Sequence, residues 1–243
     1  MIAIDKSKVA LPSYLSSHWA NDAFQKNIEA KKYISGSHSN EDIKKALKII
    51  YNNKCAYCGC DVESIHQVEH YRPSSKYYWL ALDWQNLLLV CSECNSNKSD
   101  KFPTFEVHLD NFISLENSSV LDSIEVPQII NPEQETDENL EKHFTYNLKT
   151  GEIVSETTRG KSTINTCKLN REDLCKRRRE MVGDFKNDIL KFMNDSNSPS
   201  LNLLLFATQQ KEFLAFRRYI LEHKIDELLD EILKQCGLNS KFI

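Results

Sequence analysis

Glycine is scarce in this sequence, and no glycine-rich phosphate-binding loop is present. The 243 residues include six glycines, and none of them forms the G-x-x-x-x-G-K-[S/T] pattern whose backbone amides cradle nucleotide phosphates. The sequence therefore gives no basis for ATP hydrolysis by this chain. If ATP is needed, we expect another protein to hydrolyse it.

Long apolar runs are also missing. The start, "MIAIDKSKVALPSYLSS", is too polar for the apolar core of a signal peptide, and no later run reaches the length of a membrane span. Hydrophobic residues make up 40% and charged residues 27% of the chain, which is ordinary for a globular protein. These features predict a cytoplasmic protein.

An excess of positive charge is absent as well. Lysine and arginine number 31 against 35 acidic residues, a formal net charge of −4. The chain as a whole is therefore not a general polyanion binder, and any contact with nucleic acid requires a local patch or a partner. The basic run "KRRRE" (176–180) lies on a predicted helix. A solvated helix face is the favoured interpretation of that run, and a phosphate-contacting patch is the alternative.

Cysteine, by contrast, is well represented and unevenly placed. Without an export signal, eight cysteines do not indicate a disulfide framework. "CAYC" (55–58) and "CSEC" (91–94) are two C-x-x-C pairs, and two such pairs suit tetrahedral zinc because each supplies two sulfurs from one tight turn. A redox dithiol or four buried cysteines is the alternative. The sequence predicts a structural Zn²⁺ held by Cys55, Cys58, Cys91 and Cys94, with Cys60 as a spare thiol and Cys167, Cys175 and Cys236 in helix packing.

The chain divides into four predicted regions. Their organisation predicts a mainly α protein with a small α+β centre. A segment with helical apolar spacing, in which Ser39 or Asn40 caps the second helix, comes first, followed by the cysteine-rich centre. An insert follows with a predicted hairpin that turns at Lys149-Thr150-Gly151, and then more helices. The boundaries are 1–50, 51–105, 106–161 and 162–243.

The segment between the two cysteine pairs predicts a strand, a loop, a strand and a helix. "IHQV" leads into Glu69-His70 as a first strand, and "NLLLV" (86–90) reads as a second. The helix should begin around 92–95 and end before Pro103. The aromatic residues of the intervening loop are predicted mainly to cover this small unit, with stacking on bases as the alternative; they are Tyr77, Tyr78, Trp79 and Trp84.

The order of these motifs resembles the HNH nucleases, whose ββα-metal unit is often clamped by two zinc knuckles. "CAYC", "EH", "WQN" and "CSECNSNK" carry the resemblance over residues 51–105. A second likeness, from about residue 50 to 180, is to the HNH component of Septu anti-phage systems, which also occurs with some retrons; "VEHYRPSSKYYWLALDWQN" and "IINPEQE" belong to it. Two positions depart from the HNH pattern: Asn95 replaces the final histidine and Glu69 replaces the frequent aspartate.

Phosphodiester hydrolysis requires an activated water and neutralisation of charge on the phosphate oxygens. An imidazole that is neutral near pH 7 suits removal of a proton from water, so His70 is the predicted general base. Mg²⁺ or Mn²⁺ prefers oxygen ligands, which Glu69 and the side-chain oxygen of Asn95 can supply. Together these residues predict a single catalytic metal ion beside the base.

Three further residues complete the predicted catalytic set. The resemblance makes Asn86 the middle residue of the HNH signature, which shapes the loop that orients the histidine. Arg72 and Lys98 are predicted to hold the scissile phosphate or stabilise its developing charge. The alternative is a zinc-stabilised binding module in which His70 only packs.

The resemblance implies a metal-dependent HNH endonuclease, the effector of an anti-phage complex with a PtuA-like ABC-type ATPase. DNA is the favoured substrate, and RNA, including tRNA, stays open. A retron reverse transcriptase with its RNA and DNA is a further implied partner. "LLLF" (203–206) and the 213–233 helix are the predicted docking surface. The alternatives are a non-catalytic, zinc-dependent nucleic-acid adaptor of the same complex and a stand-alone HNH nuclease or toxin.

Overall fold

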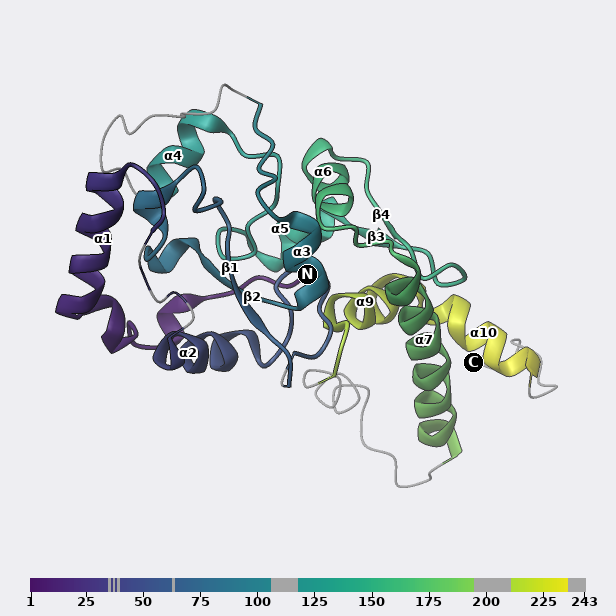
Figure 1. Cartoon of the computed structure of the whole chain (residues 1–243). Helices are drawn as coiled ribbons and strands as arrows, with labels where there is room; N and C mark the ends of the chain where they lie inside the picture. Colours follow the sequence, from purple (N-terminus) through teal and green to yellow (C-terminus); the bar gives the residue numbers. More distant parts are fainter. Residues whose placement is uncertain are drawn as a thin grey trace.

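The fold is built around one short hairpin, as the computed structural model in Figure 1 shows. The structure describes residues 1–34, 36, 38, 40–62, 64–105, 118–194 and 211–235. Helices α1 and α2 lie on one side of the hairpin β1–β2, and the C-terminal helices α7, α9 and α10 lie on the other. In chain order the elements are η1 Lys6–Lys8, η2 Ser13–Ser16, α1 His18–Ala30, α2 Glu41–Tyr51, β1 Gln67–His70, η3 Tyr78–Leu80, η4 Trp84–Asn86, β2 Leu87–Val90, α3 Ser92–Lys98, α4 Ser118–Glu125, α5 Asp137–His143, β3 Thr145–Tyr146, β4 Ile153–Val154, α6 Thr158–Thr166, α7 Glu172–Asn194, α9 Leu214–Tyr219, the π-helical turn η5 Ile220–Lys224, and α10 Ile225–Gln235.

The two predicted N-terminal helices are confirmed, and side-chain caps define where they begin. Ser17 accepts a hydrogen bond from the Ala20 amide at the start of α1, and Asn40 accepts one from the Asp42 amide at the start of α2. Such caps satisfy amides that have no partner within the helix. One face of α2 is buried in the core; its residues there are Ile43, Leu47 and Tyr51. The alternative cap, Ser39, lies outside the described residues.

The predicted strand–loop–strand–helix unit is also confirmed. β1 pairs antiparallel with β2, and His70 stands opposite Leu87. All four side chains of β2 are buried, and helix α3 packs against β1. The aromatic loop covers this unit as predicted, because Tyr77, Tyr78 and Trp79 are buried. The unit therefore places the end of β1 and the first turns of α3 side by side.

The insert contains the predicted hairpin. β3 and β4 pair antiparallel, with Tyr146 opposite Ile153. Gly151 adopts φ +72°, and a Cβ at this position would lie 2.2 Å from the Cys175 carbonyl oxygen. The turn therefore requires glycine, both for its left-handed backbone and for its close approach to α7. Residues 106–117 of the insert lie outside the described part.

The C-terminal helices pack on this hairpin and on the centre. Arg178, in the basic run of α7, is only 1% exposed. Its guanidinium donates to the carbonyl oxygens of Gly151 and Leu169, at 3.1 and 2.8 Å. The solvated-face interpretation is therefore wrong for Arg178, which ties α7 to the insert. Within the described residues, no helix combines the length and the apolar character needed to cross a bilayer.

Candidate active site and metal centre

The four cysteines of the two C-x-x-C pairs converge on one buried point. Their sulfur atoms all lie within 4.8 Å of one another, and the Cys58 and Cys91 sulfurs are 3.8 Å apart. Two thiolates on one tetrahedral zinc are separated by about 3.8 Å, because each Zn–S bond is about 2.3 Å. The donor set and its geometry therefore fit a metal ion such as zinc.

The first knuckle is shaped by its backbone. Gly59 adopts φ +75°, and its amide donates to the Cys55 carbonyl at 3.0 Å. The Cys55 amide donates to the Cys60 carbonyl, and the Ala56 amide donates to Leu89 in β2. These bonds close a tight loop and attach it to the hairpin, so the sulfur atoms face the second pair.

The second knuckle begins helix α3. Cys91 is the N-cap residue, and its sulfur accepts a hydrogen bond from the Cys94 amide at 3.4 Å. Hydrogen bonds from neighbouring thiols, Cys55 first, lower the pKa of the Cys91 thiol. The Arg171 guanidinium lies 3.6 Å from the Cys94 sulfur and 3.8 Å from the Cys91 sulfur. A cation at this position offsets the negative charge of a tetrathiolate, and the spacing of the cysteines gave no sign of it.

Cys60 lies next to the four-thiol group without belonging to it. Its side chain is buried, and its sulfur lies 3.1 Å from that of Cys58. Hydrogen bonds with Cys55, Cys58 and Cys91 raise the pKa of the Cys60 thiol. Cys167 and Cys175 are buried, as expected of packing residues, and Cys236 lies outside the described residues.

His70 ends β1 and is 7% exposed. Its Nε2 atom lies 2.9 Å from the Ala81 carbonyl oxygen. Because a carbonyl only accepts, Nε2 carries the proton and Nδ1 is the basic nitrogen. Burial is the main reason that the pKa of His70 is lowered to about 3, and the neighbouring His38 adds to it. The ring is therefore neutral at pH 7 and able to accept a proton.

Asn86 fixes the loop that contains Ala81, whose carbonyl oxygen is the hydrogen-bond partner of His70. It is fully buried, and its amide nitrogen donates to the carbonyl oxygens of Arg72 and Leu80, each at 3.0 Å. Its side-chain oxygen accepts from the Arg72 amide at 2.7 Å. Leu80 immediately precedes Ala81, so these bonds fix the carbonyl that orients the histidine ring.

Glu69, Lys98 and Asn95 lie on the adjoining faces of β1 and α3. The Lys98 ammonium, which is fully buried, donates to Glu69 Oε1 at 2.7 Å and to the His70 carbonyl oxygen at 2.8 Å. Burial raises the pKa of Glu69, and Lys98 opposes that shift. The Asn95 amide nitrogen donates to the Gln67 side chain. Lys98 therefore orients the Glu69 carboxylate next to His70.

The structure does not place Arg72 with Glu69, Lys98 and Asn95. Its guanidinium is fully buried and donates to Glu125 and Asp122 of α4. It also lies over the Phe102 ring, 4.7 Å from the ring centroid. Tyr77 donates to the other oxygen of Glu125 at 2.6 Å. This network joins α4 to the loop after β1, and no phosphate can reach the guanidinium without breaking it.

Arg72→Met should therefore act on stability. Removing the guanidinium breaks its ion pairs with Glu125 and Asp122, and loss of one member of a buried ion pair costs about 3–5 kcal/mol. We expect urea unfolding to show a loss of this size, with the exposed Lys76→Met as an unchanged control. Reduced cleavage by a variant of wild-type stability would instead assign Arg72 to the phosphate.

His38 is the functional candidate that the sequence did not identify. Its ring centroid lies 4.6 Å from that of His70, and its Nδ1 atom lies 2.9 Å from the Tyr33 hydroxyl. Tyr33 and His38 both belong to the connection between α1 and α2. In the sequence, His38 stands between small polar residues without any pattern, so only the path of the chain reveals the pairing.

Sequence comparison relates the chain to known proteins. The family model described as "HNH endonuclease" matches residues 55–101. A "Septu protein PtuB" from Bacillus mycoides (strain KBAB4) is 29% identical over 172 residues, covering 64% of this chain and 56% of that protein. Another from Bacillus thuringiensis is 35% identical over 144 residues, covering 58% and 46%. A "Septu protein PtuA" from Bacillus mycoides (strain KBAB4) is 24% identical over 195 residues, covering 74% of this chain and 26% of that protein. The matches thus span about half the length of the PtuB relatives.

Proposed function

Because residues 55–101 belong to the HNH endonuclease family, we propose that the chain is a metal-dependent endonuclease of a Septu-type anti-phage complex. The observation that carries this proposal is the arrangement at the end of β1. There, a neutral imidazole is held by a backbone carbonyl next to a carboxylate that a buried lysine orients. A histidine that only packs in the core requires neither this carbonyl partner nor an oriented carboxylate next to it.

In the proposed reaction, His70 Nδ1 removes the proton from the attacking water. A phosphate beside the ring favours the protonated imidazole, because nearby negative charge raises the pKa of a cationic acid. Glu69 and Asn95 would hold Mg²⁺ or Mn²⁺, which would neutralise charge on the phosphate and leaving oxygens. Asn86 keeps the ring oriented through the Leu80–Ala81 segment, and Lys98 keeps Glu69 aimed.

The thiol cluster would hold a structural zinc ion. Four buried thiols whose sulfur atoms lie within 4.8 Å of one another support this assignment, as does the 3.8 Å between the Cys58 and Cys91 sulfurs, which is the edge length of a ZnS₄ tetrahedron. Both knuckles are attached to β2, either by a hydrogen bond or directly along the chain. Zinc would therefore set the position of the strand that pairs with β1, and through it the position of His70.

His38 would position His70. Its ring packs on the base, while Tyr33 holds its Nδ1 atom. We expect His38→Ala to lower kcat for cleavage about tenfold, equivalent to about 1.4 kcal/mol, without changing the metal concentration needed. His38→Phe, which keeps a ring at this position, should recover part of the rate. The exposed His18→Ala is the matched control; wild-type kcat in His38→Ala would contradict the role.

The partner proposed here is a PtuA-like ABC-type ATPase. The similarity to proteins named Septu PtuB and PtuA supports it.

The predicted docking segment 203–206 lies outside the described residues. Among the described residues of the 213–233 helix no large hydrophobic side chain is exposed, whereas Trp19 and Ile49 of α1 and α2 are 67% and 71% exposed. The N-terminal helices are therefore the better candidates for docking, and co-purification with a Trp19→Ser variant tests them.

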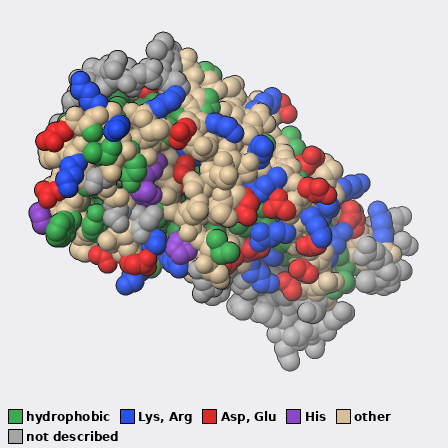
Figure 2. Space-filling model, viewed as in Figure 1, with side chains coloured by type: hydrophobic (Ala, Val, Ile, Leu, Met, Phe, Trp, Pro, Cys, Tyr) green, Lys and Arg blue, Asp and Glu red, His purple; other side chains and the backbone are tan. Residues whose placement is uncertain are grey.

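On the face shown in Figure 2, Lys and Arg side chains (blue) are interspersed with Asp and Glu side chains (red). The charge on this face therefore does not favour binding of an extended nucleic acid. This distribution fits a nuclease that receives its substrate within a complex. The test of function is cleavage of plasmid DNA and of tRNA by the chain co-purified with its ATPase. Cleavage in Mg²⁺ or Mn²⁺ that stops with EDTA is expected. Nucleic-acid binding without cleavage in any metal would favour the adaptor alternative.

A further inference from the structure

Arg171 connects the C-terminal helices to the thiol group of the proposed zinc site. It lies immediately before α7, outside the segment 55–101 that matches the HNH family. Its Nη1 atom donates to the Cys94 sulfur at 3.6 Å, and its Nη2 atom donates to the Cys91 sulfur at 3.8 Å. The guanidinium therefore spans both sulfur atoms of the second C-x-x-C pair, as a planar fork of donors can.

The surrounding chain holds Arg171 at this position. Its backbone amide donates to the Lys168 carbonyl at 3.2 Å, and its carbonyl accepts from the Cys175 amide at 3.1 Å. The side chain is held as well, because an Asp173 carboxylate oxygen lies 3.2 Å from its Nε atom and Nη1 also donates to the Lys168 carbonyl at 3.4 Å. Only 13% of the side chain is exposed. The contacts with sulfur are therefore part of a fixed local arrangement.

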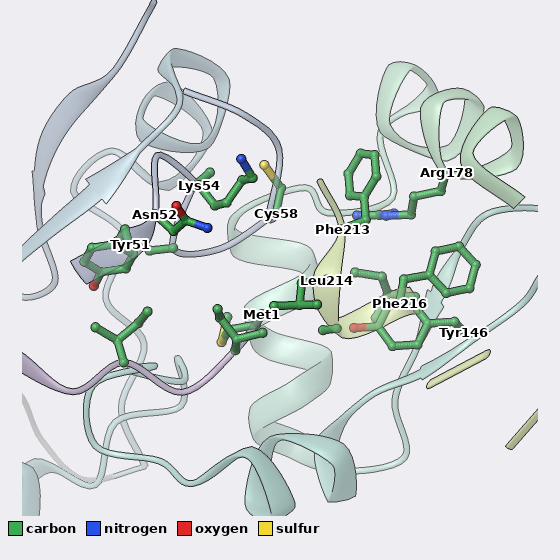
Figure 3. A pocket seen from close by; sticks show the side chains of 17 residues that line it. Met1, Tyr51, Asn52, Lys54, Cys58, Tyr146, Arg178, Phe213, Leu214 and Phe216 are labelled. Carbon is green, nitrogen blue, oxygen red and sulfur yellow. The ribbon is translucent and has the colours of Figure 1, made fainter. Parts of the chain in front are cut away.

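The thiol group requires such a cation if it holds zinc. Four thiolates around one Zn²⁺ carry two net negative charges, which are costly to bury without compensation. Figure 3 shows a side of the group where Cys58 lies among the residues that line a largely apolar cavity of about 40 Å³. Arg178 also lines this cavity, but its guanidinium donates to the carbonyl oxygens of Gly151 and Leu169. Among the described residues, the hydrogen bonds from a cation to the thiol group come from Arg171.

From these contacts we propose that Arg171 determines how tightly the chain holds zinc. This inference rests on the proposed zinc site. The guanidinium lowers the net negative charge of the site, and its two donors stabilise Cys91 and Cys94 as metal-bound thiolates. Hydrogen-bonding partners of metal ligands change metal affinity by about 10–100-fold. Arg171 is thus a positioning residue, and zinc retention depends on the C-terminal region as well as on the four cysteines.

The experiment measures the zinc dissociation constant of purified full-length variants by competition with a chromophoric chelator. Arg171→Gln, which removes the charge, should bind zinc about 10–100-fold more weakly than wild type. Arg171→Lys keeps the charge but loses the fork, so its affinity should lie between these two. Arg179→Gln, the same substitution at an exposed arginine of α7, is the matched control and should bind zinc as wild type does.

Cobalt substitution separates this role from a purely structural one. Loss of the donors and of the cation raises the energy of the sulfur lone pairs. The sulfur-to-cobalt charge-transfer band of Arg171→Gln should therefore move to longer wavelength, while the band of Arg179→Gln stays at the wild-type position. A change confined to the packing around α7 would not move the band.

Wild-type zinc affinity in Arg171→Gln would overturn the proposal, and so would weaker zinc binding with an unchanged cobalt band. If Arg171→Gln is insoluble, Arg171→Lys decides, because wild-type affinity and band position in that variant would overturn the proposal. Zinc in the wild-type chain is measured first. A wild-type chain without zinc would overturn the metal centre together with this inference, whereas a zinc-loaded wild type with unaffected variants would overturn this inference alone.

Discussion

Cys91→Ala should leave residues 51–104 unfolded and the chain without zinc. Cys91 has two roles, since its sulfur belongs to the four-thiol group and also caps helix α3. The segment it organises contains two four-residue strands and one seven-residue helix, too little regular structure to be stable alone. Structural zinc contributes about 10–16 kcal/mol of apparent folding free energy in small domains, so its loss exceeds what the remaining contacts supply.

Hydrogen exchange resolved along the chain, together with zinc content by mass spectrometry, checks this expectation. Protection should disappear from β1, β2 and α3. Cys175→Ala, which removes a buried thiol outside the cluster, should retain both zinc and protection in these elements. A folded, zinc-free Cys91→Ala protein with full activity would show that neither folding nor activity depends on zinc.

His70→Ala should abolish cleavage while zinc content and partner binding stay at wild-type levels. Loss of a general base lowers the rate by about 10²–10⁴, or about 3–5 kcal/mol of transition-state stabilisation. The substitution also leaves the Ala81 carbonyl without its donor, which costs about 1–3 kcal/mol of stability. Cleavage must therefore be measured well below the unfolding temperature of the variant.

Single-turnover cleavage by the purified complex gives this rate directly. His18→Ala, an exposed histidine on α1, is the matched control and should cut at the wild-type rate. Should His70→Ala cleave as fast as wild type, the histidine only packs, and the zinc-dependent adaptor becomes the better account of the chain.

The parts of the site that could be predicted from sequence depend on local patterns. The C-x-x-C pairs fix two tight turns, and the apolar run at 87–90 fixes a buried strand between them. Glu69 and His70 follow as the end of the paired strand. These features need only neighbouring residues, so their sequence signal survives in the folded chain.

The parts that could not be predicted depend on distant segments. Arg72 stands close to His70 in sequence, yet its carboxylate partners come from α4, and burial between them removes it from any phosphate. His38 shows the opposite case, since it is remote in sequence but packs on His70. Neither contact leaves a periodicity or spacing that a single sequence displays.

The central claim is that His70 removes a proton from water, whereas Glu69 and Asn95 bind the catalytic metal ion. The measurement that separates these roles is the cleavage rate as a function of Mn²⁺ concentration for His70→Ala, Glu69→Ala and Asn95→Ala, each with confirmed zinc content. The account predicts that high Mn²⁺, which tolerates poorer ligand sets than Mg²⁺, restores part of the activity of Glu69→Ala and Asn95→Ala. No Mn²⁺ concentration should restore His70→Ala. Recovery of His70→Ala by Mn²⁺, with Glu69→Ala and Asn95→Ala unaffected, would contradict the assignment.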